Sequence, residues 1–192
     1  MYELVVMGAS WGGLDALGRV LAALPPDFPV PVVVVQHRSA QSRGGTLEAM
    51  LAIDGGLPVR EIDDKDAILP GAAYVAPADY HLIVERGSFA LSVDERVQHA
   101  RPSIDVTLET AADSYGSRMI GVVLTGANED GAAGLRTVME RGGITVVQDP
   151  ASAAKPTMPQ AAIDAGGAQR VLPLEEIAPF LIVACGGARR AA

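Results

Sequence analysis

The sequence predicts an α/β fold with a doubly wound, mostly parallel sheet, helices on both faces and a small antiparallel ribbon insertion. Short apolar stretches alternate with stretches of helical periodicity along most of the 192 residues. Apolar residues make up 49% of the chain and aromatic residues only 4%, so the core must be largely aliphatic, which is typical of a sheet buried on both faces. In the middle of the chain, several short strands follow one another without intervening helices.

The first part of the chain predicts two strands and two helices. Residues 2–7 form an apolar run that ends at a glycine and indicates a buried strand. Residues 13–24 repeat apolar positions at helical spacing, and two prolines end that helix. Residues 30–35 are nearly all valine, which indicates a strand buried on both faces, and a helix is expected over residues 43–53.

The middle segment predicts the ribbon. Strands are expected over residues 58–62, 72–76, 81–85 and 89–94, with glycine and proline turns between them. Alternation then resumes with helices over 102–115, 130–141, 158–165 and 175–185 and strands over 119–124, 144–147 and 171–174. No internal repeat or low-complexity linker interrupts the chain, so residues 1–192 are expected to form one domain.

Charge and cysteine content exclude several classes of protein. The formal net charge of −8 repels phosphate backbones, so no nucleic-acid partner is expected. Cys185 is the one cysteine, so no intrachain disulfide can form, which agrees with a reducing cytoplasm; we interpret it as a helix-packing residue, not a nucleophile. No signal peptide precedes the first strand and no apolar run could span a bilayer, so we expect a cytoplasmic protein without membrane insertion.

A serine lies just beyond the first strand, at the edge where doubly wound sheets bind ligands. Ser10 is the third residue of the stretch GASWGG, residues 8–13. Its glycines allow a sharp turn, and the helix that follows offers free N–H groups that could stabilise an anion beside Ser10. The stretch also matches the G-x-S-x-G pattern of nucleophile elbows, which predicts that Ser10 is a nucleophile.

Two further residues beyond strand ends complete a candidate site. His37 follows the valine-rich strand, and Asp130 lies in LTGANEDG, residues 124–131. Each also has a structural interpretation, because a strand-end histidine can bond a carbonyl and an aspartate before a helix is often an N-cap. Together with Ser10 they supply a nucleophile, a base and an orienting acid. The chain order Ser, His, Asp differs from that of α/β-hydrolases, which indicates the same chemistry on a different fold.

The glycine-rich turn also allows a rival interpretation as a dinucleotide-binding site. The fingerprint G-x-G-x-x-G would need glycine at Ser10, and the second strand should end in an acid where Gln36 and His37 stand. No G-K-[ST] follows for a P-loop, and no H-x-x-x-H spacing predicts a metal, so we expect neither cofactor nor metal.

Other candidates for catalytic residues are weaker. His81 and His99 end no strand of the parallel core. Ser103 and Asp105 could rim a site, although helix capping explains Ser103 equally well.

Six short motifs occur in order along essentially the whole chain. They are GASWGG at 8–13, QH at 36–37, YVAP at 74–77, RPSID at 101–105, LTG through DG at 124–131, and QDP at 148–150 with MP at 158–159. In this order they resemble the catalytic domain of the chemotaxis protein-glutamate methylesterases, the CheB family.

The resemblance implies hydrolysis of glutamate methyl esters on the cytoplasmic domain of methyl-accepting chemotaxis receptors, with release of methanol, and possibly deamidation of glutamines there. It places the catalytic triad on Ser10, His37 and Asp130. The alternative is a catalytically weak homologue that acts only as a module binding a receptor or signalling partner.

The resemblance also implies an oxyanion site formed by backbone N–H groups near Trp11, Gly12 and Ala127. Two departures concern this site: Trp11 stands where members often have Thr, and Ala127 replaces the Met of the pattern G-M-G-x-D-G. Many members also carry an N-terminal receiver domain. Because the first strand is predicted from residue 2, we expect a stand-alone form, with residues 1–192 as a single methylesterase catalytic domain and no receiver domain.

Overall fold

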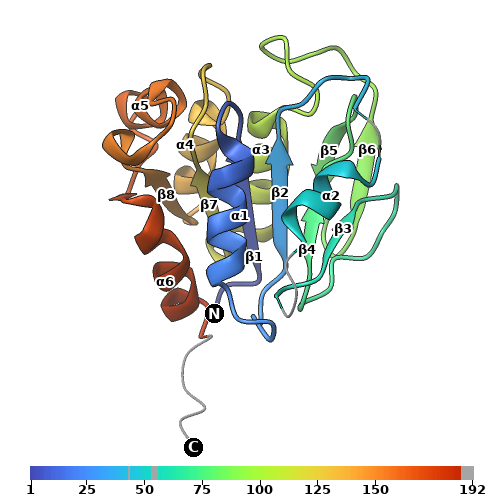
Figure 1. Ribbon diagram of the computed structural model, residues 1–192, viewed down its shortest axis with the longest axis horizontal. Coiled ribbons are helices and arrows are strands. Elements are labelled where there is room, and N and C mark those ends of the chain that lie inside the picture. The colour runs from blue at the N-terminus through green and yellow to red at the C-terminus, as the bar shows by residue number, and fades with distance from the viewer. Residues whose placement is uncertain (43, 53–55, 187–192) are drawn as a thin grey trace, which may run out of the picture.

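A seven-stranded parallel sheet forms the centre of the computed structural model, which describes residues 1–42, 44–52 and 56–186 (Figure 1). The strands lie in the order β3-β4-β2-β1-β7-β8-β9, so the chain starts in the middle and winds outward in both directions. They are β1 (Leu4–Ala9), β2 (Val32–Gln36), β3 (Val59–Glu61), β4 (Ala73–Val75), β7 (Met119–Val123), β8 (Ile144–Gln148) and β9 (Arg170–Leu172). The predicted doubly wound α/β fold is confirmed.

Helices cover both faces of this sheet. One layer, in front of the strands in Figure 1, contains α1 (Gly13–Ala23), α2 (Thr46–Leu51) and α6 (Leu174–Ala184); the other contains α3 (Ile104–Tyr115), α4 (Ala132–Glu140) and α5 (Thr157–Asp164). Side chains of a strand point alternately to the two faces, so β1 contributes Val5 and Met7 to the first layer and Leu4 and Val6 to the second. All four are fully buried, which explains the continuous apolar run.

The assignment of the whole middle segment to an antiparallel ribbon is wrong. β3 pairs parallel with β4 and β4 pairs parallel with β2, so both strands extend the main sheet. Among the named strands of the described residues, β5 (His81–Val84) and β6 (Phe89–Ser92) alone form an antiparallel pair, so the predicted small ribbon is confirmed for these two strands. A three-residue buried strand such as β4 carries no local signal of its partner's direction, which is decided by where the chain re-enters the core.

Several predicted boundaries move by about two residues, and two of the shifts matter for the site. α3 begins at Ile104 with Ser103 as its N-cap, not at Pro102. α4 begins at Ala132 with Gly131 as its N-cap, so Asp130 lies outside the helix. The predicted helix over residues 43–53 corresponds to α2, and its two end positions lie outside the described residues.

The buried position of Cys185 agrees with its predicted role in helix packing. Cys185 caps the C-terminal end of α6 and is buried in the core cluster on that face of the sheet, and burial raises the pKa of its thiol to about 11. It therefore stays protonated near neutral pH, as expected of a packing residue. In the described part of the chain, no helix is long and apolar enough to cross a membrane.

Candidate active site

The candidate site lies at the carboxyl ends of β1, β2 and β7. Ala9 and Gln36 are the last paired residues of β1 and β2, and Ser10 and His37 follow them directly. The N–H of His37 donates to Ala9 O at 3.0 Å, and the N–H of Ser10 donates to Thr125 O, beyond β7, at 2.9 Å. Ser10 is therefore held between the ends of two neighbouring strands, at the edge that the sequence predicted.

The turn after Ser10 needs its glycines for steric reasons. Gly12 adopts a positive φ of 76°, a conformation that side chains other than glycine rarely adopt. A Cβ on Gly13 would collide with the Gln36 amide oxygen and with Ala9. The Nε2 group of Gln36 donates to Ser10 O and to His37 O, each at 2.9 Å, so one side chain ties the two candidate residues together.

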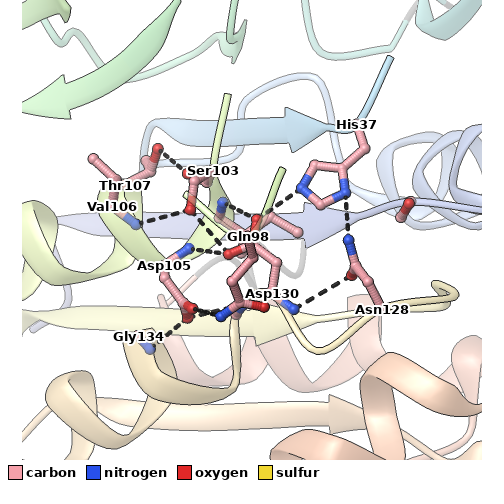
Figure 2. Close-up of polar contacts among 12 residues, drawn as sticks. His37, Gln98, Ser103, Asp105, Val106, Thr107, Asn128, Asp130 and Gly134 are labelled. Atoms are coloured by element: carbon pink, nitrogen blue, oxygen red, sulfur yellow. Dashed lines mark hydrogen bonds and ion pairs between the residues drawn. The ribbon is translucent and has the colours of Figure 1, made fainter. Parts of the chain in front are cut away.

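Asp130 is fully buried, and its carboxylate accepts four hydrogen bonds (Figure 2). Oδ2 accepts from His37 Nε2 and from the Ile104 N–H, both at 2.7 Å. Oδ1 accepts from Ser103 Oγ and from the Asp105 N–H, both at 2.9 Å. Burial opposes ionisation, but the bonds from His37 and from the α3 N–H groups outweigh it and lower the pKa of Asp130.

Asp130 is not the N-cap of the helix that follows it. That role falls to Gly131, whose N–H donates to Asp105 Oδ1 at 2.8 Å; the Gly134 N–H donates to the same oxygen at 2.7 Å. Burial and the nearby Asp130 charge raise the pKa of Asp105 to about 6, although these N–H groups act against the rise. The capping interpretation of Asp130 therefore fails, and its carboxylate is directed at His37 and at the N-terminus of α3.

Asn128 contacts His37, although the sequence did not identify it as a candidate site residue. Its Nδ2 lies 3.2 Å from His37 Nδ1, and its Oδ1 accepts from the Asp130 N–H at 3.3 Å (Figure 2). Asn128 stands where the pattern G-M-G-x-D-G has its second glycine, and that departure was the available signal. Within the described residues, Ser10 Oγ makes no hydrogen bond to His37.

The three oxyanion candidates lie on adjoining loops. Thr125 Oγ1 donates to Trp11 O at 2.9 Å, which joins the loop after β1 to the loop after β7 that carries Ala127. The N–H groups of Trp11, Gly12 and Ala127 have no acceptor among the described residues, so they are available to a ligand. The Trp11 side chain is 65% exposed, with Lys155 Nζ 6.0 Å from its ring centre.

The weaker candidates separate into structural and peripheral residues. His81 is buried. Its Nε2 donates to Glu95 O at 2.9 Å and its Nδ1 accepts the Ser103 N–H at 3.3 Å, so His81 supports the N-cap of α3.

His99 lines a cavity of about 360 Å³ beside His37. That cavity is also lined by Arg38, Arg96, Arg101 and Asn128. Across the described residues, no cluster of three or more His, Cys, Asp or Glu side chains could hold a metal ion.

A serine next to a histidine whose ring is bonded to a buried carboxylate is the arrangement that a serine-type ester hydrolase requires, here on a doubly wound α/β sheet. The family model for CheB methylesterase matches residues 5–181. The chain therefore belongs to the CheB methylesterase family.

Relatives and a solved structure agree with this assignment. A protein of Leptospira interrogans is 44% identical over 94% of each chain. Protein-glutamate methylesterase/protein-glutamine glutaminase 1 of Carboxydothermus hydrogenoformans is 43% identical over 92% of this chain and 53% of its own length, so this chain spans about half of that relative. The crystal structure of the Thermotoga maritima CheB methylesterase catalytic domain superposes with a TM-score of 0.88 at 35% identity, covering 96% of this chain and 99% of that one.

Proposed function

We propose that this chain is a cytoplasmic protein-glutamate methylesterase that hydrolyses methyl esters of glutamate side chains on the cytoplasmic domain of methyl-accepting chemotaxis receptors. The same site would deamidate glutamines there, since its relatives are named for both activities. The observation that carries the proposal is the Asp130 carboxylate, which three donors of the α3 N-terminus hold against the His37 ring beside Ser10. A carboxylate so fixed orients the ring and stabilises its charged form.

In the first step, Ser10 Oγ attacks the ester carbonyl carbon and its proton passes to His37 Nδ1, because Nε2 already donates to Asp130. The oxyanion that forms is met by the free N–H groups of Trp11, Gly12 and Ala127; losing one such donor typically costs about 100- to 1,000-fold in rate. The bond from carbonyl carbon to methoxy oxygen then breaks, and methanol leaves with the proton from His37.

In the second step, water attacks the glutamyl ester on Ser10 while His37 Nδ1 takes its proton. The bond between the carbonyl carbon and Ser10 Oγ breaks, the serine recovers a proton from His37, and the glutamate side chain leaves as its carboxylic acid, which ionises. With a glutamine substrate, ammonia replaces methanol as the first leaving group. No cofactor takes part in either step.

The surroundings of Ser10 suit a protein substrate. The exposed Trp11 indole offers a large amphipathic contact beside the nucleophile, the kind of side chain that anchors protein interfaces. The cavity next to His37 is lined by Arg38, Arg96 and Arg101. Arg38 is paired with Glu61, and Arg96 and Arg101 share Asp79, so one positive charge is left for a carboxylate near the ester of the substrate.

The deciding experiment measures methanol release from a methylated receptor of the same genome. Ser10→Ala should release none above background. Ser117→Ala is the matched control, because Ser117 is exposed and precedes β7, at the opposite end of the sheet from Ser10. Unchanged release by Ser10→Ala would refute the assignment. The alternative, a binding module without catalysis, predicts receptor binding by the unmutated chain with no methanol release and no fluorophosphonate labelling of Ser10.

A further inference from the structure

Asn128 occupies the ring nitrogen of His37 that the proposed reaction needs. The Asp130 N–H can only donate, so the Asn128 atom that faces it must be the amide oxygen, and the amide nitrogen faces His37. A carboxylate can only accept, so the ring proton lies on Nε2, between His37 and Asp130. His37 Nδ1 therefore carries the lone pair, and the Asn128 amide donates to it at 3.2 Å.

The candidate nucleophile is placed beside this histidine without engaging it. Gln36 binds the carbonyl groups of both Ser10 and His37, so the two residues are fixed next to each other across β1 and β2. Over the described residues, Ser10 Oγ has no hydrogen-bond partner. The lone pair that would accept the serine proton is already used by Asn128.

We propose that Asn128 is a positioning residue that holds His37 in a resting state and must release Nδ1 before Ser10 can transfer its proton there. The proposal rests on the proposed function, because it requires His37 to be the base for Ser10. Asn128 is half-buried and lines the cavity beside His37, so an oxygen atom of an entering substrate can accept the amide N–H in place of the ring. Substrate entry would thereby free Nδ1.

The first test is the rate at which a small fluorophosphonate labels Ser10 in the intact chain. Asn128→Ala removes the competing donor and should label about two- to tenfold faster than the unmutated chain, the range set by the net value of one neutral hydrogen bond. Asn128→Asp keeps the size but replaces the donor with a carboxylate that favours a proton on Nδ1, so it should label more slowly. Glu129→Ala, an exposed neighbour in the same loop, should match the unmutated chain.

A faster labelling rate in Asn128→Ala together with a slower one in Asn128→Asp indicates a hydrogen-bonding role for Asn128. A packing role would instead slow labelling in both variants. Labelling by Asn128→Ala that is equal to or slower than that of the unmutated chain overturns the proposal. A loss of folding would show as a lower melting temperature. Asn128→Gly, which removes the whole side chain and restores the glycine of the pattern G-M-G-x-D-G, then provides the second variant with the same expected increase.

The second readout is independent of activity. In ¹⁵N NMR of the histidine rings, Asn128→Ala should move the His37 Nδ1 resonance and leave Nε2 in place, whereas Ser10→Ala should move neither. An unmoved Nδ1 resonance in Asn128→Ala overturns the proposal even in a chain that hydrolyses no ester. If the unmutated chain neither labels nor releases methanol while Nδ1 does move, the proposed function fails and the Asn128 contact stands.

Discussion

Asp105 and Asp130 hold the starts of two helices in a reciprocal way. Asp130 accepts hydrogen bonds from the first turn of α3, which contains Asp105, and Asp105 accepts hydrogen bonds from the start of α4, which follows Asp130. Asp130 precedes α4, yet its carboxylate accepts the N–H groups of Ile104 and Asp105 at the start of α3. Asp105 belongs to α3, yet it accepts the N–H groups of Gly131 and Gly134 at the start of α4. The position of the candidate catalytic carboxylate therefore depends on the packing of two helices against each other, not on its own loop.

The carboxylate itself is tested by Asp130→Asn. An amide in this position cannot accept from all four donors, so one NH₂ group must face a donor and His37 loses its preferred tautomer. We expect kcat for methanol release to fall about 10⁴-fold, as for other triads that lose their acid. A rate within tenfold of the unmutated enzyme, in a variant shown to be folded by circular dichroism, would exclude Asp130 as the orienting acid.

Ser103→Ala tests the support of that carboxylate. Ser103 Oγ donates to Asp130 Oδ1 at 2.9 Å and accepts the Val106 N–H at 3.4 Å as the N-cap of α3. Loss of an N-cap typically costs about 1 kcal/mol of unfolding free energy, which urea denaturation would detect. Loss of one Asp130 donor should also lower kcat, while KM stays constant. Ser114→Ala, in the same helix and bonded to Val84 O at its other end, should leave kcat unchanged.

Asp105 predicts a pH dependence of stability. Its pKa is raised from the ordinary 3.8 to about 6, so between these values the folded protein binds a proton that the unfolded chain releases. The free energy of unfolding should therefore fall as pH rises from about 4 to 6 and remain lower above that window. In Asp105→Asn, whose amide oxygen still accepts the Gly131 and Gly134 N–H groups, this part of the slope should disappear.

The measurement is urea denaturation of both proteins at several pH values across this window. The pKa of Asp130 is shifted in the opposite direction, downward. Its contribution to the free energy of unfolding is therefore lost only as pH falls below the ordinary pKa of an aspartate, so it does not mask the effect of Asp105 in this window. The Glu109 pKa is also raised, chiefly by burial, and its contribution is present in both proteins and cancels in the comparison. Identical slopes for the two proteins would show that Asp105 is ionised throughout.

Trp11→Thr separates the two roles proposed for residue 11. The backbone N–H stays in place, so labelling of Ser10 by a small fluorophosphonate should change less than twofold. The indole, 65% exposed beside the nucleophile, is removed, so KM for a methylated receptor should rise about tenfold or more, the usual cost of an aromatic anchor at an interface. An unchanged KM would show that the receptor does not contact this side chain.

The mostly parallel sheet and the edge at which the candidate residues meet could be predicted from the apolar pattern of the sequence. Continuous apolar runs such as residues 30–35 form strands buried on both faces, and parallel strands bring their carboxyl ends to one side. The positions of Ser10, His37 and Asp130 after strands therefore predict that the three residues lie together. The direction of β4 could not be obtained in this way, because three buried residues fit either orientation.

The groups that surround the carboxylate and the imidazole depend on tertiary packing, so they could not be predicted from the sequence. His37 and Asp130 are 93 residues apart in the chain and 2.7 Å apart in space, and the donors on α3 reach Asp130 only after α3 and α4 have packed together. From the sequence, Asp105 could only be named as a candidate for the rim of the site, and nothing local in the chain shows that Asn128 faces His37 or that Asp105 accepts from the start of α4. A hydrogen bond depends on distances of a few ångströms between side chains, and those distances exist only once the sheet has joined distant segments.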